Sequence, residues 1–148
     1  MGTHSKYGRK VMTAAFGSEF KHWGASVEVD YGCGPPARID GVVGGDVAVE
    51  IESRVGKQVR GALCDLVFHR FPKKLLVIEP VHMTDAEVCA EQCRLVLRRF
   101  VCVNDFRVVV LRGSGWADRL DADVAAVREA LAGLRTQSAE IATGSTDG

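Results

Sequence analysis

Residues 38–53, RIDGVVGGDVAVEIES, decide the fold, because they have the pattern of two strands joined by a tight turn. The connection Gly44-Gly45-Asp46 consists of residue types that tolerate positive φ, as β-hairpin turns require. A three-residue loop places Asp40 opposite Glu50, whereas a two-residue turn at Gly44-Gly45 places it opposite Val49. The composition of the turn permits both registers, so the face on which Asp40 lies stays open from sequence.

Two acidic residues of the second strand share one face. Glu50 and Glu52 lie two positions apart and project to the same side, while Val49 and Ile51 face the core. Like charges on a half-buried sheet repel one another and are costly without a compensating cation. With Asp40 in the first register they form a three-carboxylate face, which suits a hard cation such as Mg²⁺. The alternative is an exposed acidic hairpin face without a function.

Other elements follow from hydrophobic periodicity. The sequence predicts helices over residues 6–23, 55–70, 84–100 and 118–134, and strands over residues 26–31, 74–80 and 106–112. Thr84 is expected to cap the third helix, with Glu87 completing a capping box.

This order predicts an α/β fold, a mixed central sheet flanked by helices. We expect one domain over residues 1–135, and a disordered polar tail over residues 136–148, TQSAEIATGSTDG.

The composition is that of an ordinary globular protein, with 148 residues, 47% hydrophobic, 26% charged and a formal net charge of zero. No apolar run is long enough to span a membrane, and no apolar segment follows the basic N-terminus as in a secretory signal. We therefore expect a cytoplasmic protein that does not enter membranes. The five cysteines form no C-x-x-C pair, which favours reduced thiols over a zinc site or a redox protein.

The predicted order and the hairpin carboxylates resemble the PD-(D/E)XK nucleases, the superfamily of restriction endonucleases. The resemblance covers residues 6–80, and more loosely extends to 112. It rests on Asp40 in the second strand, Glu50-Ile51-Glu52 in the third, and a helix directly afterwards. In that family, the hairpin Asp and the first acidic residue of the (D/E)-x-K element hold a divalent metal. The resemblance therefore implies a restriction-endonuclease-like α-β-β-β-α-β core with a further α-β-α, and an Mg²⁺-dependent DNA endonuclease in which Mn²⁺ can substitute.

Glu52 stands where the family usually has lysine, as it does in a minority of restriction enzymes with an E-x-E element. Three alternatives follow from the resemblance: Glu52 binds metal or polarises water, Lys57 supplies the missing positive charge, or the site is inactive. Glu19 on the opening helix is a further candidate metal ligand, because an acid on the N-terminal helix contributes to the site in some family members.

The start of the helix after the hairpin carries candidates for contacts with DNA phosphates, namely Lys57, Gln58 and Arg60. A chain of this length leaves little room for a separate target-recognition domain. We therefore expect a homodimer on double-stranded DNA, or a subunit that depends on a partner. The alternative from another class is a non-catalytic module that keeps the nuclease fold to bind nucleic acid or a protein. The missing lysine and the neutral net charge favour that alternative.

Overall fold

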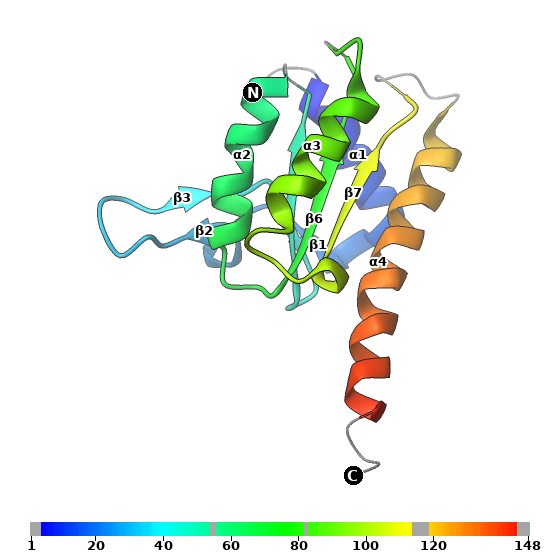
Figure 1. Cartoon of the computed structure of the whole chain (residues 1–148). Coiled ribbons are helices and arrows are strands. Elements are labelled where there is room, and N and C mark those ends of the chain that lie inside the picture. Colours follow the sequence, from blue (N-terminus) through cyan, green and yellow to red (C-terminus); the bar gives the residue numbers. More distant parts are fainter. Residues whose placement is uncertain (1–3, 54–55, 82, 114–118, 145–148) are drawn as a thin grey trace.

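The computed structural model describes residues 4–53, 56–81, 83–113 and 119–144 (Figure 1). The α-helices are α1 (His4–Phe16), α2 (Gly56–Phe68), α3 (Ala86–Leu97) and α4 (Leu120–Gly144). The strands are β1 (Phe20–Lys21), β2 (Glu28–Val29), β3 (Ala37–Arg38), β4 (Gly41–Val43), β5 (Val47–Glu52), β6 (Lys73–Ile78) and β7 (Phe106–Val110). Three short 3₁₀ turns, η1 (Gly17–Glu19), η2 (Ala25–Val27) and η3 (Val103–Asp105), connect them.

The central sheet has five strands in the order β1-β4-β5-β6-β7. The pairs β1–β4 and β4–β5 are antiparallel, and the pairs β5–β6 and β6–β7 are parallel. Strands β2 and β3 form a separate antiparallel ribbon. The α/β class with a mixed sheet flanked by helices is therefore confirmed.

Helices cover both faces of the sheet (Figure 1). On one face, Ala48, Leu76 and Ile78 pack with residues of α2 and α3. On the other face, Val49, Ile51 and further strand residues pack with α1 and α4. Because alternate side chains of a strand point to opposite faces, Glu50 and Glu52 belong to the α2/α3 face together with Ala48.

The β4–β5 hairpin adopts the three-residue loop. Val43 pairs with Val47 and Gly41 with Val49, so residues 44–46 form the turn. Gly44 has a φ of 60°, a left-handed conformation that glycine adopts without steric cost. This register excludes the two-residue turn. The strand expected to carry Asp40 is divided into β3 and β4, and Asp40 lies in the bend between them, one residue before the Gly41–Val49 pair.

Two boundaries near the N-terminus differ from the sequence prediction. The helix predicted over residues 6–23 ends at Phe16, and Phe20 starts strand β1. Gly17, with a φ of 56°, breaks the helix, and pairing of Phe20 with Val43 replaces helical hydrogen bonds. The strand predicted over residues 26–31 is shorter, because η2 occupies its start and only Glu28–Val29 pairs.

Later boundaries also shift. Helix α3 begins at Ala86 with Asp85 as its N-cap and no side-chain capping bond, so the Thr84 capping box is wrong. Helix α4 runs to Gly144 and includes residues 136–144, for which the sequence predicts a disordered tail. Extending an existing helix avoids the cost of nucleation, so good helix formers such as Ala139 and Glu140 can continue it.

The predicted starts at Val55 and Asp118 lie outside the described residues. Among the residues that are described, no helix has the length and apolar character needed to cross a membrane.

Candidate functional site

Asp40 and Glu50 are joined through the backbone at the end of the hairpin away from its turn. The backbone N–H of Asp40 donates to Glu50 Oε1 at 2.8 Å. The backbone N–H of Ile51 donates to Asp40 Oδ2 at 2.7 Å. Each carboxylate therefore receives a backbone hydrogen bond from the other's strand, and the two acids are held as neighbours.

The two glutamates of β5 are buried, each with 6% relative exposure. Burial, together with the charges of Asp40, Glu52 and Asp65, raises the pKa of Glu50 from 4.5 to about 9, and the hydrogen bond from Asp40 acts in the opposite direction. A buried acid surrounded by other acids favours either a proton or a cation. This is the electrostatic condition of a site that binds a positive ion.

Asp65 and Tyr31 lie near enough to Glu50 to interact with it electrostatically, and sequence reasoning missed both. Asp65 lies on α2, and its Oδ1 accepts a hydrogen bond of 2.6 Å from the hydroxyl of Tyr31. Burial and the charge of Asp65 raise the pKa of Tyr31 to about 12, and Glu50 also contributes. The Tyr31 ring stacks on Phe68 with centroids 4.3 Å apart. No local motif marks these residues, because packing of the β2–β3 ribbon against α2 brings them together.

Glu79 is a further acid that sequence reasoning missed. It lies within residues 74–80, for which the sequence predicts only a strand. It follows β6, is fully buried, and accepts a hydrogen bond of 2.6 Å from the backbone N–H of Gly8 at Oε1. Its Oε2 is buried and has no hydrogen-bond partner among the residues that the structure describes. Burial raises its pKa to about 7. Contact with α1 places Glu79 on the opposite sheet face from Glu50.

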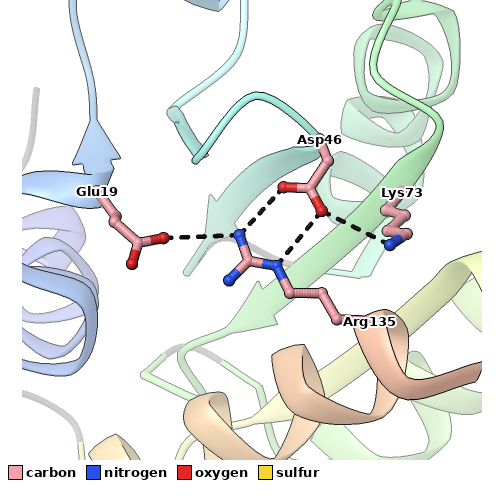
Figure 2. Close-up of polar contacts among 4 residues, drawn as sticks. All are labelled: Glu19, Asp46, Lys73 and Arg135. Carbon is pink, nitrogen blue, oxygen red and sulfur yellow. Dashed lines mark hydrogen bonds and ion pairs between the residues drawn. The ribbon is translucent and has the colours of Figure 1, made fainter. Parts of the chain in front are cut away.

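Glu19, the further candidate metal ligand, lies in a different cluster from the Asp40–Glu50 pair. Its Oε2 lies 3.6 Å from the guanidinium of Arg135, beside the hairpin turn (Figure 2). Its carbonyl accepts a hydrogen bond of 3.1 Å from Gly44. Because α1 ends at Phe16, Glu19 is carried to the turn end of the hairpin, whereas Asp40 and Glu50 lie toward the other end.

Figure 2 shows the cluster that contains Glu19. Arg135 of α4 donates to both oxygens of Asp46, at 3.1 and 3.3 Å, and Lys73 lies 3.6 Å from Asp46 Oδ2. Burial acts to raise the pKa of Asp46, but the hydrogen bond and charge of Arg135 and the charge of Lys73 lower it overall. This cluster ties α4 to the hairpin turn and has the balanced charges of a structural contact.

The predicted basic residues lie at the start of α2. Lys57 and Gln58 are exposed on its first turn. Within the described part of the chain, Lys57 makes no ion pair with Asp40, Glu50 or Glu52. Arg60 is exposed, and its Nη1 donates to Gln92 Oε1 of α3 at 2.7 Å.

Over the described ranges, no three His, Cys, Asp or Glu side chains are arranged to hold one metal ion, so a closed three-carboxylate cage is not formed. Mg²⁺ commonly uses one or two carboxylates together with waters and substrate phosphates, and Asp40 and Glu50 are oxygen donors of that kind. No family model, curated protein or solved structure matches this chain.

Proposed function

We propose that the protein is an Mg²⁺-dependent DNA endonuclease of the restriction-endonuclease-like type, with Mn²⁺ as a possible substitute. The observation that carries the proposal is the Asp40–Glu50 pair, in which Asp40 is half-buried, Glu50 is buried and the pKa of Glu50 is raised to about 9. The central sheet supports it, because helix α1 precedes the antiparallel strands β1, β4 and β5, and helix α2 then leads to the parallel strand β6. The β2–β3 ribbon is inserted between β1 and β4 and departs from the order expected of that superfamily.

In the proposed reaction, water is added across a phosphodiester. The water oxygen forms a new bond to phosphorus, and the sugar oxygen leaves with the electron pair and takes a proton from solvent. Asp40 and Glu50 would hold the ion, which when bound supplies charge neutralisation at the phosphate and a more acidic water. Glu52 ends β5 on the same face as Glu50, and we assign it the proton released by the attacking water.

Lys57, Gln58 and Arg60 are assigned to contacts with backbone phosphates of double-stranded DNA. Their exposure at the start of α2, directly after the strand that bears the glutamates, supports this assignment. We further propose that the protein acts as a homodimer or in a complex with a partner subunit. The five free cysteines support a reducing, cytoplasmic location.

A second candidate function is a non-catalytic module that binds nucleic acid or a protein. Two observations favour it: Glu52 replaces the usual lysine, and Lys57 does not pair with the carboxylates in the described structure. A module of this kind has no need of Mg²⁺. Metal dependence therefore separates the two candidates.

The test is incubation of supercoiled plasmid with the protein in Mg²⁺, Mn²⁺ or EDTA. Glu50→Gln keeps an oxygen that can accept the Asp40 hydrogen bond but removes the charge. Glu129→Gln, at an exposed glutamate of α4, is the matched control. We expect metal-dependent nicking by the wild type and the control, and none by Glu50→Gln. Equal nicking by Glu50→Gln contradicts the proposed site, and no cleavage by any folded form favours the binding module.

A further inference from the structure

The hollow between the starts of α2 and α3 is separate from the Asp40–Glu50 pair. It has a volume of about 320 Å³, and its walls include Gly56 and Arg60 of α2 and Val88 and Gln92 of α3. Gly56 follows Glu52 by four residues, and Glu52 ends β5 on the sheet face that α2 and α3 cover. The hollow therefore lies at the carboxyl end of the strand that bears the proposed catalytic glutamate.

The chemistry of the hollow suits a nucleotide. Arg60 is held across it by the hydrogen bond of 2.7 Å to Gln92, and this contact uses one of the five N–H donors of a guanidinium. The first turns of α2 and α3 also border the hollow, and the positive ends of their dipoles favour an anion. Met83 and Val88 add apolar wall, and Val88 is 56% exposed despite being apolar.

We propose that this hollow binds one unpaired nucleotide of a DNA strand, with its phosphate on Arg60 and its base against Met83 and Val88. Small-molecule pockets begin at about 300 Å³, so a hollow of about 320 Å³ lies at the small end of that range and suits a ligand no larger than one nucleotide. The inference rests on the proposed function and narrows its substrate to double-stranded DNA that has an unpaired nucleotide beside the cleavage position. Arg60 then binds the phosphate of that nucleotide, and Lys57 and Gln58 keep the contacts with the paired strands.

Asp85 offers an internal check on this assignment. Asp85 lines the hollow and is the N-cap residue of α3, but its side chain makes no capping hydrogen bond. A carboxylate in the wall opposes binding of a phosphate. Asp85→Asn therefore tightens binding if the ligand is an anion, whereas a purely structural role for these residues predicts no gain.

The test is fluorescence anisotropy of a labelled single-stranded oligonucleotide and of the matching duplex, both in EDTA. We expect the single strand to bind about tenfold more tightly than the duplex, and Arg60→Ala to weaken single-strand binding about tenfold, as for loss of a charged hydrogen bond. Arg99→Ala, at an exposed arginine beyond α3, is the matched control and leaves binding unchanged. Asp85→Asn is expected to strengthen binding a few-fold.

Several results overturn the proposal. One is an affinity for the duplex equal to the affinity for the single strand. Another is an affinity of Arg60→Ala for the single strand equal to that of Arg99→Ala. Binding of deoxythymidine monophosphate, measured by calorimetry, without any binding of the oligonucleotide identifies a free nucleotide as the ligand instead. If circular dichroism shows that Arg60→Ala does not fold, the affinity of Asp85→Asn for the single strand is the test. The assignment is then overturned if Asp85→Asn binds the single strand no more tightly than the wild type does. Because oligonucleotide binding is measured without metal, it can be observed even if the plasmid is not cleaved. Cleavage of the plasmid can likewise be observed even if the hollow does not bind the oligonucleotide.

Discussion

The backbone N–H of Asp40 lies 2.8 Å from Oε1 of Glu50 and donates a hydrogen bond to it. This contact anchors a buried acid next to a second acid, in a position where neither a lysine nor an arginine is bonded to Glu50 in the described structure. The cost of that arrangement is electrostatic, and a bound cation would offset it. The stability of the protein should therefore respond both to Mg²⁺ and to pH.

Mg²⁺ should stabilise the folded protein through the Asp40–Glu50 pair. Ligand at about ten times its dissociation constant adds about 1.4 kcal/mol of stability, which raises the melting temperature by several degrees. We expect this shift in the wild type and in Glu129→Gln, but not in Glu50→Gln or Asp40→Asn. Differential scanning fluorimetry with and without Mg²⁺ measures it. An unchanged shift in Glu50→Gln would place the metal elsewhere.

The stability of the metal-free protein should depend on pH through Glu50. Its folded pKa is raised from 4.5 to about 9, so the folded state holds a proton that the unfolded state releases, and stability falls as pH rises across that window. The loss is at most about 1.4 kcal/mol per pH unit for one group. Glu50→Gln lacks this titration and should become the more stable protein at pH 8.

Urea unfolding at several pH values between these two pKa values tests that prediction. Glu79, with its pKa raised to about 7, contributes in the same direction, and Lys74, lowered by burial to about 8, acts oppositely at higher pH. Glu79 and Lys74 are present in both the wild type and Glu50→Gln. The difference between the free energies of unfolding of these two proteins therefore reports on Glu50 alone. A difference that does not grow with pH contradicts the raised pKa.

Gly8→Ala should destabilise the protein, because α1 passes very close to the sheet at this residue. A Cβ on Gly8 would collide with Ile51 and with the carboxylate of Glu79. Overpacking of this kind costs about 1–3 kcal/mol. Gly61→Ala in α2 is the matched control, since its Cβ would meet no atom within 4 Å. That change should stabilise by up to about 1 kcal/mol, because alanine is the better helix former. Equal effects of the two substitutions in chemical denaturation would refute close packing at Gly8.

Glu19→Gln should leave Mg²⁺ binding and DNA cleavage unchanged. Glu19 pairs with Arg135 at the hairpin turn, and both side chains are well exposed, at 59% and 39%. Solvent screening therefore limits the loss of stability to about 0.5 kcal/mol. Asp46→Asn, which removes the better buried partner of Arg135, should cost more. Melting temperatures and the plasmid assay measure both effects, and loss of the Mg²⁺ shift in Glu19→Gln would restore it as a ligand.

The carboxylates of β5 could be placed from sequence because their arrangement is local. Side chains alternate along any strand, so Glu50 and Glu52 share a face once the strand is recognised. The register of the hairpin was only narrowed to two choices, since Gly44-Gly45-Asp46 accommodates either turn. Pairing of Val43 with Val47 in the folded sheet selects one of them and brings Asp40 to Glu50.

Contacts between distant segments were decided by tertiary structure alone. Glu19 reaches Arg135, Tyr31 reaches Asp65, and Gly8 reaches Glu79. None of these pairs has a periodic signal, because each depends on how a helix or ribbon packs against the sheet. The amino-acid sequence by itself determined the strand pattern, the α/β class and the acidic face of β5. Packing decided which acids are neighbours and how deeply they are buried, because burial depends on the whole chain surrounding a residue.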